Sequence, residues 1–85
     1  MKIWKYTLQM HDLQTLTIPV GAKLLSLQMQ EGQPQLWALV NEAAPCEPRR
    51  ITVYGTGQPI YNDPGVFIGT FQYGEYVFHV FEAEK

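Results

Sequence analysis

The stretch from residue 24 to residue 40, LLSLQMQEGQPQLWALV, decides the fold of this 85-residue chain. Over residues 24–30 apolar and polar side chains alternate, which is typical of a strand with one buried face. Glu31-Gly32 is a tight-turn signal, and residues 35–40 then return with apolar side chains on both faces. The stretch therefore predicts a β-hairpin whose second strand lies in the middle of a sheet or beneath another element.

Alternation with a period of two predicts further strands before and after this hairpin. Within the first strand of the hairpin, Leu25, Leu27 and Met29 are expected to face inward. Gly69, inside a later strand, indicates a bulge or a close backbone approach. The predicted strands cover residues 2–10, 14–18, 24–30, 35–40, 50–54, 66–72 and 76–81.

The segments between these strands are rich in proline, glycine and other turn formers. Residues 41–48 contain two prolines and no alternation, so we expect a loop there, with at most one short helical turn at 41–45. Residues 55–65 are expected to form a long irregular connection, and residues 82–85 a polar tail. Because no window keeps helical spacing over three turns, the chain is predicted to be all-β. It is expected to form one domain, residues 1–85, built as a small antiparallel sandwich or partly open barrel of about seven short strands.

The charge balance argues against nucleic-acid binding. The chain has six basic and eight acidic residues and a formal net charge of −2. Its basic residues are scattered, with Arg49-Arg50 as the one adjacent pair. Because nucleic-acid-binding proteins usually carry a basic patch or stripe, binding driven by phosphate neutralisation is not expected.

Cysteine usage and hydropathy indicate the compartment. A single cysteine, Cys46, excludes an intramolecular disulfide and a cysteine-based zinc site. The longest apolar run, residues 36–40, is far shorter than the roughly 20 residues that span a bilayer. The N-terminus lacks the apolar core and cleavage site of a signal peptide. We therefore expect no membrane partner and a location in a reducing cytoplasm.

The sequence offers no set of nucleophile, base and orienting group. Cys46 lies in a proline-rich segment, and His11 and His79 lack the close spacing of a metal site. Counting by two places His79 with Val77 and Phe81 on one side of the last strand, where a packed or rim histidine is expected. We expect no enzyme activity, no catalytic residue, no metal ligand and no cofactor.

Two glycines in ITVYGTGQPIYNDPG, residues 51–65, raise the question of a phosphate-binding loop. Neither the lysine of a Walker loop nor the third glycine and helix of a dinucleotide site is present. The structural interpretation is that Gly55 and Gly57 allow positive φ where a strand ends. The functional interpretation is a loop that displays side chains to a ligand. The candidate binding residues are Arg50, Tyr54, Gly55, Thr56, Gly57, Gln58 and Tyr61.

Aromatic residues are too numerous for the interior of so short a chain. There are two tryptophans, five tyrosines and four phenylalanines, so some are expected at the surface. Surface rings serve as interface anchors or as platforms for stacking bases. The low basic charge favours an interface, and a small sheet often covers a face or an edge with a copy of itself, so we expect a homo-oligomer.

Several segments, in order, resemble a family of small proteins recurring in phage and prophage genomes, a family of unassigned function. The resemblance extends from residue 2 to residue 82 and is weakest at 41–49. It implies a phage or mobile-element origin and expression in a bacterial cytoplasm, and it carries no catalytic motif. The segments that carry it are KIWKY, IPVGAKLLSLQ, LWALV, YGTGQPI, FIGTFQ and VFHVFE.

Three functions remain open from the sequence. The leading hypothesis is a non-enzymatic phage accessory protein that modulates or inhibits a host protein through an aromatic surface and the 55–65 loop. The first alternative is a protein that binds or sequesters a small molecule or nucleotide, using the amides of residues 55–58 with Arg49 or Arg50 beside them. The second alternative is a single-stranded nucleic-acid binder that stacks bases on its aromatic rings.

Overall fold

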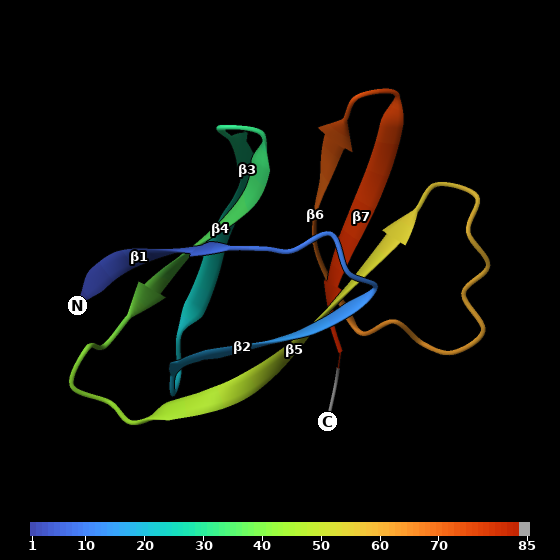
Figure 1. Ribbon diagram of the computed structural model, residues 1–85. Coiled ribbons are helices and arrows are strands. Elements are labelled where there is room, and N and C mark those ends of the chain that lie inside the picture. The colour runs from blue at the N-terminus through green and yellow to red at the C-terminus, as the bar shows by residue number, and fades with distance from the viewer. Residues whose placement is uncertain (84–85) are drawn as a thin grey trace.

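A computed structural model describes residues 1–83, and this part of the chain contains strands but no helix (Figure 1). The prediction of an all-β chain with seven strands is confirmed. Residues 84–85 of the predicted polar tail lie outside the described residues. The strands are β1 (Lys2–Thr7), β2 (Leu13–Pro19), β3 (Lys23–Gln30), β4 (Gln33–Val40), β5 (Cys46–Gly55), β6 (Val66–Tyr73) and β7 (Tyr76–Glu82).

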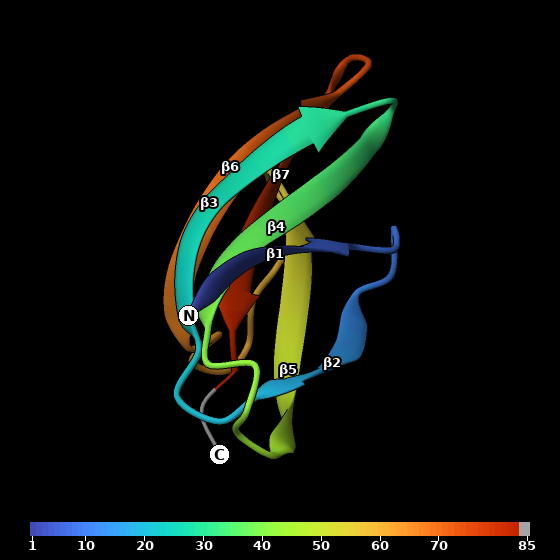
Figure 2. The ribbon, with the colours of Figure 1, turned by 90° about the vertical axis from the view of Figure 1, so that its left-hand side faces the viewer.

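The strands form two antiparallel sheets that are not closed into a barrel. One sheet has the order β1-β4-β3 and the other β2-β5-β7-β6. Strands β3 and β6, the last strand of each sheet, lie side by side (Figure 2). The predicted mid-sheet position of residues 35–40 is confirmed, because β4 pairs with both β1 and β3.

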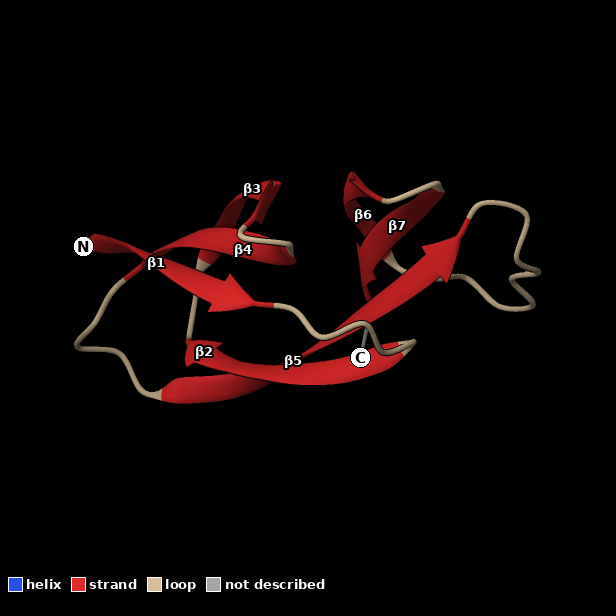
Figure 3. Cartoon of the chain, turned by 45° about the horizontal axis from the view of Figure 1, so that its top comes forward, coloured by secondary structure: helices blue, strands red, loops and turns tan. Residues whose placement is uncertain are grey.

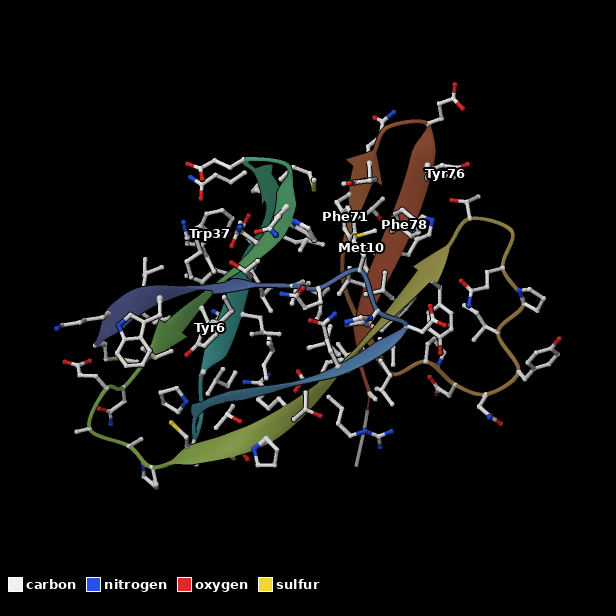
Figure 4. The ribbon with its side chains drawn as sticks, in the orientation of Figure 1. Tyr6, Met10, Trp37, Phe71, Tyr76 and Phe78 are labelled. Atoms are coloured by element: carbon white, nitrogen blue, oxygen red, sulfur yellow. The ribbon has the colours of Figure 1, made fainter. Side chains whose placement is uncertain are left out.

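The core lies between the two sheets. Leu36 of β4 packs in one cluster with Ile51 of β5 and Val80 of β7, and all three side chains are almost fully buried. Phe71 and Phe78 also face inward from β6 and β7, and their rings stack with centroids 5.4 Å apart (Figure 4). Since strand side chains alternate, these buried positions fix which residues of the same strands face solvent.

The β3–β4 hairpin has the predicted two-residue turn. Glu31 and Gly32 have φ values of 55° and 78°, and Gln30 pairs with Gln33 on either side of them. Positive φ at both central positions is typical of a type I′ turn, whose twist matches that of the flanking strands. Glu31 is the one residue other than glycine with positive φ among residues 1–83.

We expect the substitution Glu31→Asn to raise the free energy of unfolding by about 1 kcal/mol, because asparagine tolerates the left-handed region better than glutamate. Urea denaturation of the two proteins measures this difference. The matched control is Glu75→Asn in the β6–β7 turn, where only Gly74 has positive φ, and it should leave stability nearly unchanged. An equal gain at both positions would contradict the assignment.

The structure corrects the prediction for Leu25. The register of β3 against β4 shifts between Leu24 and Ser26, and this bulge turns Leu25 outward, where it is 45% exposed. Leu24 packs against the core instead, whereas the predicted inward positions of Leu27 and Met29 are confirmed. Alternation along a strand cannot reveal a bulge, because the extra residue reverses the faces on one side of it.

The predicted loop at 41–48 is wrong over its last residues. Strand β5 begins at Cys46, and Pro48 pairs with Thr17 of β2. Among the strands of residues 1–83, β7 pairs with β5 only from Ile51 onward, so no described strand pairs with Pro48 on that side. The missing N–H of Pro48 therefore interrupts no described strand pairing, which explains why the strand tolerates it. The predicted helical turn at 41–45 is a single hydrogen-bonded turn, from Ala44 N to Asn41 O, and not a helix.

Gly69 lies both at a bulge and at a close approach between strands, the two alternatives that the sequence indicated. The register of β6 against β7 shifts between Phe67 and Gly69, and a Cβ at Gly69 would lie 3.2 Å from the Cβ of Leu27. The glycine therefore lets β6 approach β3.

The first strand is shorter than predicted, because it ends at Thr7 rather than at residue 10.

The longest connection joins β5 to β6 over residues 56–65, as predicted (Figure 3). Gly65 closes it with a φ of 104°, and a Cβ there would lie 2.0 Å from the backbone oxygen of Glu82. Glu82 belongs to β7 rather than to the predicted polar tail. Residues 1–83 hold no apolar helix with the length needed to pass through a bilayer.

Candidate functional site

The solvent-facing side of the four-stranded sheet carries a transverse row of side chains. Thr52 of β5 pairs with Leu13 of β2 and with Phe81 of β7, and Phe81 pairs in turn with Phe67 of β6. Directly paired residues share one face of a sheet. We call Leu13, Thr52, Phe81 and Phe67 the outer row; it crosses all four strands on the side opposite the core.

Three rings form an aromatic cluster around this row. The ring of Phe81 meets Tyr54 with centroids 6.0 Å apart and Phe67 with centroids 5.5 Å apart, both edge to face. This arrangement is favourable because the positive edge of one ring meets the negative face of the other. Phe67 is nevertheless 56% exposed and Leu13 50% exposed. The aromatic cluster of Tyr54, Phe67 and Phe81 is therefore organised and yet open to solvent.

A histidine held by two threonines lies beside the cluster. The hydroxyl of Thr56 is 2.7 Å from Nε2 of His79, and the hydroxyl of Thr70 is 3.0 Å from Nδ1. Each ring nitrogen of His79, which the sequence predicts as a packed or rim histidine, is therefore hydrogen-bonded to a threonine hydroxyl. The Thr56–His79 pair resembles a nucleophile with its base, but the group behind the histidine is a hydroxyl rather than a carboxylate. The contacts fix the imidazole and tie the start of the 56–65 connection to the sheet.

The amides of the glycine pair are largely engaged within the protein. Gly55 N–H donates to Oε1 of Gln58 at 2.9 Å, and Gln58 N–H donates to the Gly55 carbonyl at 3.0 Å. Thr56 N–H donates to the carbonyl of Val77. Gly57 has positive φ, as predicted, whereas Gly55 does not and lies within β5. Few free N–H groups are left at residues 55–58 to hold an anion.

The two adjacent arginines have different roles. Arg49 points toward the interior, where Nε and Nη2 donate to the Glu82 carboxylate and Nη1 donates to the Ala22 carbonyl at 2.6 Å. The hydrogen bond to Glu82 raises the pKa of Arg49 above its ordinary value. Arg50 is exposed and lines an open groove of about 610 Å³ with Thr15, Pro48, Val66 and Ala83, along with the Arg49–Glu82 pair.

The structure brings together only part of the predicted site. Arg50, Tyr54 and Thr56 lie along the outer side of the same sheet. Gly55, Gly57 and Gln58 build a turn, and Tyr61, 89% exposed, stands in the connection that follows. The predicted set of site residues missed six residues of this surface, which are Leu13, Thr52, Phe67, Thr70, His79 and Phe81.

One signal for the missed residues was present in the sequence. Counting by two correctly placed His79 and Phe81 on one side of β7. The partners on the neighbouring strands could not be found in this way, because their positions depend on strand order and register. Among residues 1–83 no three histidine, cysteine or acidic side chains come together as metal ligands do.

Comparison with known proteins gives one match. A family model described as Domain of unknown function (DUF7352) matches residues 1–85. No curated protein and no solved structure matches the chain.

Proposed function

We propose that this chain, which belongs to the DUF7352 family, is a non-enzymatic binding protein that contacts a protein partner through the outer row and the aromatic cluster. The observation that carries the proposal is the open, ordered arrangement of Tyr54, Phe67 and Phe81 on a sheet face. Aromatic residues and arginine are enriched at protein interfaces, and charged residues are depleted at their centres.

The distribution of polar groups supports the same proposal. Arg50 and His79 flank the aromatic cluster, so the surface combines an apolar centre with a polar margin. Fixed rings lose little conformational entropy when a partner covers them, and the edge-to-face contacts restrain these rings before binding. Tyr61, in the neighbouring connection, adds an exposed ring outside the sheet.

The resemblance to phage and prophage proteins extends the proposal to the target. Accessory proteins of this kind commonly bind and block a host factor, so we propose a bacterial cytoplasmic protein as the target and a phage or mobile-element origin for the chain. This part rests on analogy at the level of a class of proteins.

Binding of a nucleotide or another small molecule has less support. Its proposed amide donors at residues 55–58 are mostly bonded within the turn, although the groove beside Arg50 offers a cation and apolar walls. Binding of single-stranded nucleic acid by stacking on the aromatic cluster also has less support, because the basic residues of the described part, residues 1–83, are scattered along the chain rather than grouped as a phosphate backbone requires.

Affinity capture with matched variants tests the leading proposal. Wild-type protein, Phe67→Ser and Tyr76→Ser are immobilised and exposed to the same bacterial lysate. Both substituted rings are exposed, but Phe67 lies in the outer row, whereas Tyr76 lies at the end of β7 and its ring is near Phe78 (Figure 4). We expect wild type and Tyr76→Ser to retain one protein stoichiometrically and Phe67→Ser to lose most of it. Equal retention by all three, or none by wild type, would refute the proposal.

A further inference from the structure

Strand β2 forms a regular and exposed edge of the four-stranded sheet. In the order β2-β5-β7-β6 it has β5 as its one neighbour, and no described strand lies beyond it (Figure 2). Its register against β5 runs without interruption from Leu13 to Pro19. Every second side chain along this edge, at Leu13, Thr15 and Thr17, is exposed.

The pairing with β5 fixes which backbone groups of β2 remain free. Val53 N–H donates to the Asp12 carbonyl, so the backbone of Asp12 is turned toward β5. Since the backbone groups of successive strand residues point to opposite sides, those of Leu13, Thr15 and Thr17 are turned away from β5. No backbone group among residues 1–83 bonds to them there. The edge therefore offers N–H donors and carbonyl acceptors at the spacing of a β-ladder.

The other sheet edges carry features that discourage pairing with another chain. Strands β3 and β6 each have a bulge and lie against one another. Strand β1 is six residues long and contains Lys2 and Lys5. Lysines and bulges are common protections of an edge strand. Strand β2 has no charged residue and no bulge, and its proline, Pro19, stands at its end. Among the described edges, β2 is therefore the best suited to accept a further strand.

The side chains around this edge define the strand that fits it. Leu13 ends the outer row and is 50% exposed, so an apolar side chain opposite Leu13 would lengthen the row. Thr15 pairs with Arg50, which is exposed and forms no ion pair among residues 1–83. A residue opposite Thr15 would lie two strand spacings from Arg50, about 10 Å, which an arginine and a glutamate side chain span together across the short threonine. An acidic residue therefore fits this position.

We propose that the partner of this protein binds by adding an extended segment to β2 as a further, antiparallel strand of the sheet. The antiparallel direction is favoured because such a ladder is slightly more stable per residue than a parallel one. In that direction the residue opposite Thr15 comes two positions before the residue opposite Leu13. The segment is thus an acidic residue followed two positions later by a large apolar residue. The inference rests on the proposed function, since it names the part of the partner that reaches the outer row.

Peptide selection tests this mode of binding. A displayed library of random peptides is selected on immobilised wild-type protein, and the selected peptides are measured by fluorescence anisotropy against Thr15→Pro and Thr15→Val. Thr15→Pro removes a free N–H without breaking a bond to β5, and an edge strand tolerates proline at such a position. We expect Thr15→Pro to weaken binding about tenfold or more, and Thr15→Val, which keeps the N–H, to bind within about twofold of wild type. Equal binding by both variants, or selection of no peptide, overturns the proposal.

Amide hydrogen exchange locates the added strand without any substitution. In the free protein the N–H groups of Leu13, Thr15 and Thr17 should exchange quickly, and a selected peptide should slow their exchange. The control is the free edge of β1, where the amides of Ile3 and Lys5 should exchange at an unchanged rate. Slower exchange at β1 alone, or no change at β2, overturns the proposal.

A charge exchange tests the contact with Arg50. The substitution Arg50→Glu should weaken binding of a selected peptide about tenfold, and lysine in place of the acidic residue of the peptide should restore it. Selected peptides that lack an acidic residue two positions before the apolar one, or a lysine peptide that restores nothing, would overturn the assigned direction and chemistry of the segment.

The outcomes separate this inference from the proposed function. A lysate protein retained by Thr15→Pro but lost by Phe67→Ser would refute strand addition and support the outer row as the contact surface. A lysate protein lost by Thr15→Pro but retained by Phe67→Ser would support strand addition and refute the outer row. A wild-type dimer that Thr15→Pro abolishes, measured by analytical ultracentrifugation, would place a second copy at this edge and overturn the proposal.

Discussion

Replacing Gly65 with alanine is expected to lower the free energy of unfolding by about 3–5 kcal/mol. The new Cβ would lie 2.0 Å from the backbone oxygen of Glu82 and 2.9 Å from the Cα of Ala83. Backbone atoms cannot move aside as a flexible side chain can, so the 56–65 connection would have to leave β7. The φ of 104° adds strain for any residue with a side chain.

The substitution Gly57→Ala is the matched control for this prediction. Gly57 also has positive φ, 88°, but a Cβ there would meet nothing within 4 Å. Only the conformational cost remains, about 1–2 kcal/mol. Urea denaturation of both variants separates close approach from backbone strain, and equal losses would contradict the proposed role of the Glu82 backbone. A domain of this size has a stability of about 4–13 kcal/mol, so Gly65→Ala removes a large part of it.

Removing the carboxylate of Glu82 should destabilise the protein by about 2–3 kcal/mol, because the half-buried Arg49 guanidinium loses the carboxylate to which it donates two hydrogen bonds. The two side chains are only 23% and 17% exposed, and Arg49 also donates to the Ala22 carbonyl. The ion pair therefore joins β5 to the end of β7 and to the segment that leads into β3. The expected loss of about 2–3 kcal/mol lies near the lower end of the range for breaking a buried ion pair, because water still reaches both side chains.

A double-mutant cycle measures the coupling. The single variants Glu82→Leu and Arg49→Met should each lose stability, whereas the double variant should lose less than the sum of the two, since it strands neither charge. The control is Arg50→Met, which changes the neighbouring exposed arginine and should alter stability by less than about 0.5 kcal/mol. Additive losses in the cycle would show that the pair contributes no coupling energy.

The strands could be predicted from the sequence because most of them have one polar face. Alternation found most of them, and the turn at Glu31-Gly32 identified the returning strand β4 and fixed the register of the β3–β4 hairpin. The prediction from the sequence pattern failed at Leu25, where a bulge reverses the faces of the strand. It also failed at Pro48, where β5 pairs only with β2 among the described strands and so accepts a residue that normally ends a strand. Both failures depend on neighbouring strands and not on the strand itself.

The surface was harder to predict for the same reason. Tyr54 and Thr56 were found because Tyr54 precedes and Thr56 separates two conspicuous glycines, and these glycines proved to build a turn. Leu13 and Phe67 come from opposite edges of the sheet, and only the order β2-β5-β7-β6 aligns them with Phe81. Alternation gives the face of each residue, whereas a transverse row requires the order and register of four strands.

The bulges in β3 and β6 also bear on how the protein avoids fibril formation. Both strands lie at the edge of their sheet, and each has its register interrupted, at Leu24/Ser26 and at Phe67/Gly69. Cross-β growth needs a long, regular array of free amide and carbonyl groups onto which identical strands add. An interrupted edge offers only short arrays, so these two strands make poor templates despite the apolar residues of β3 and the β-branched and aromatic residues of β6.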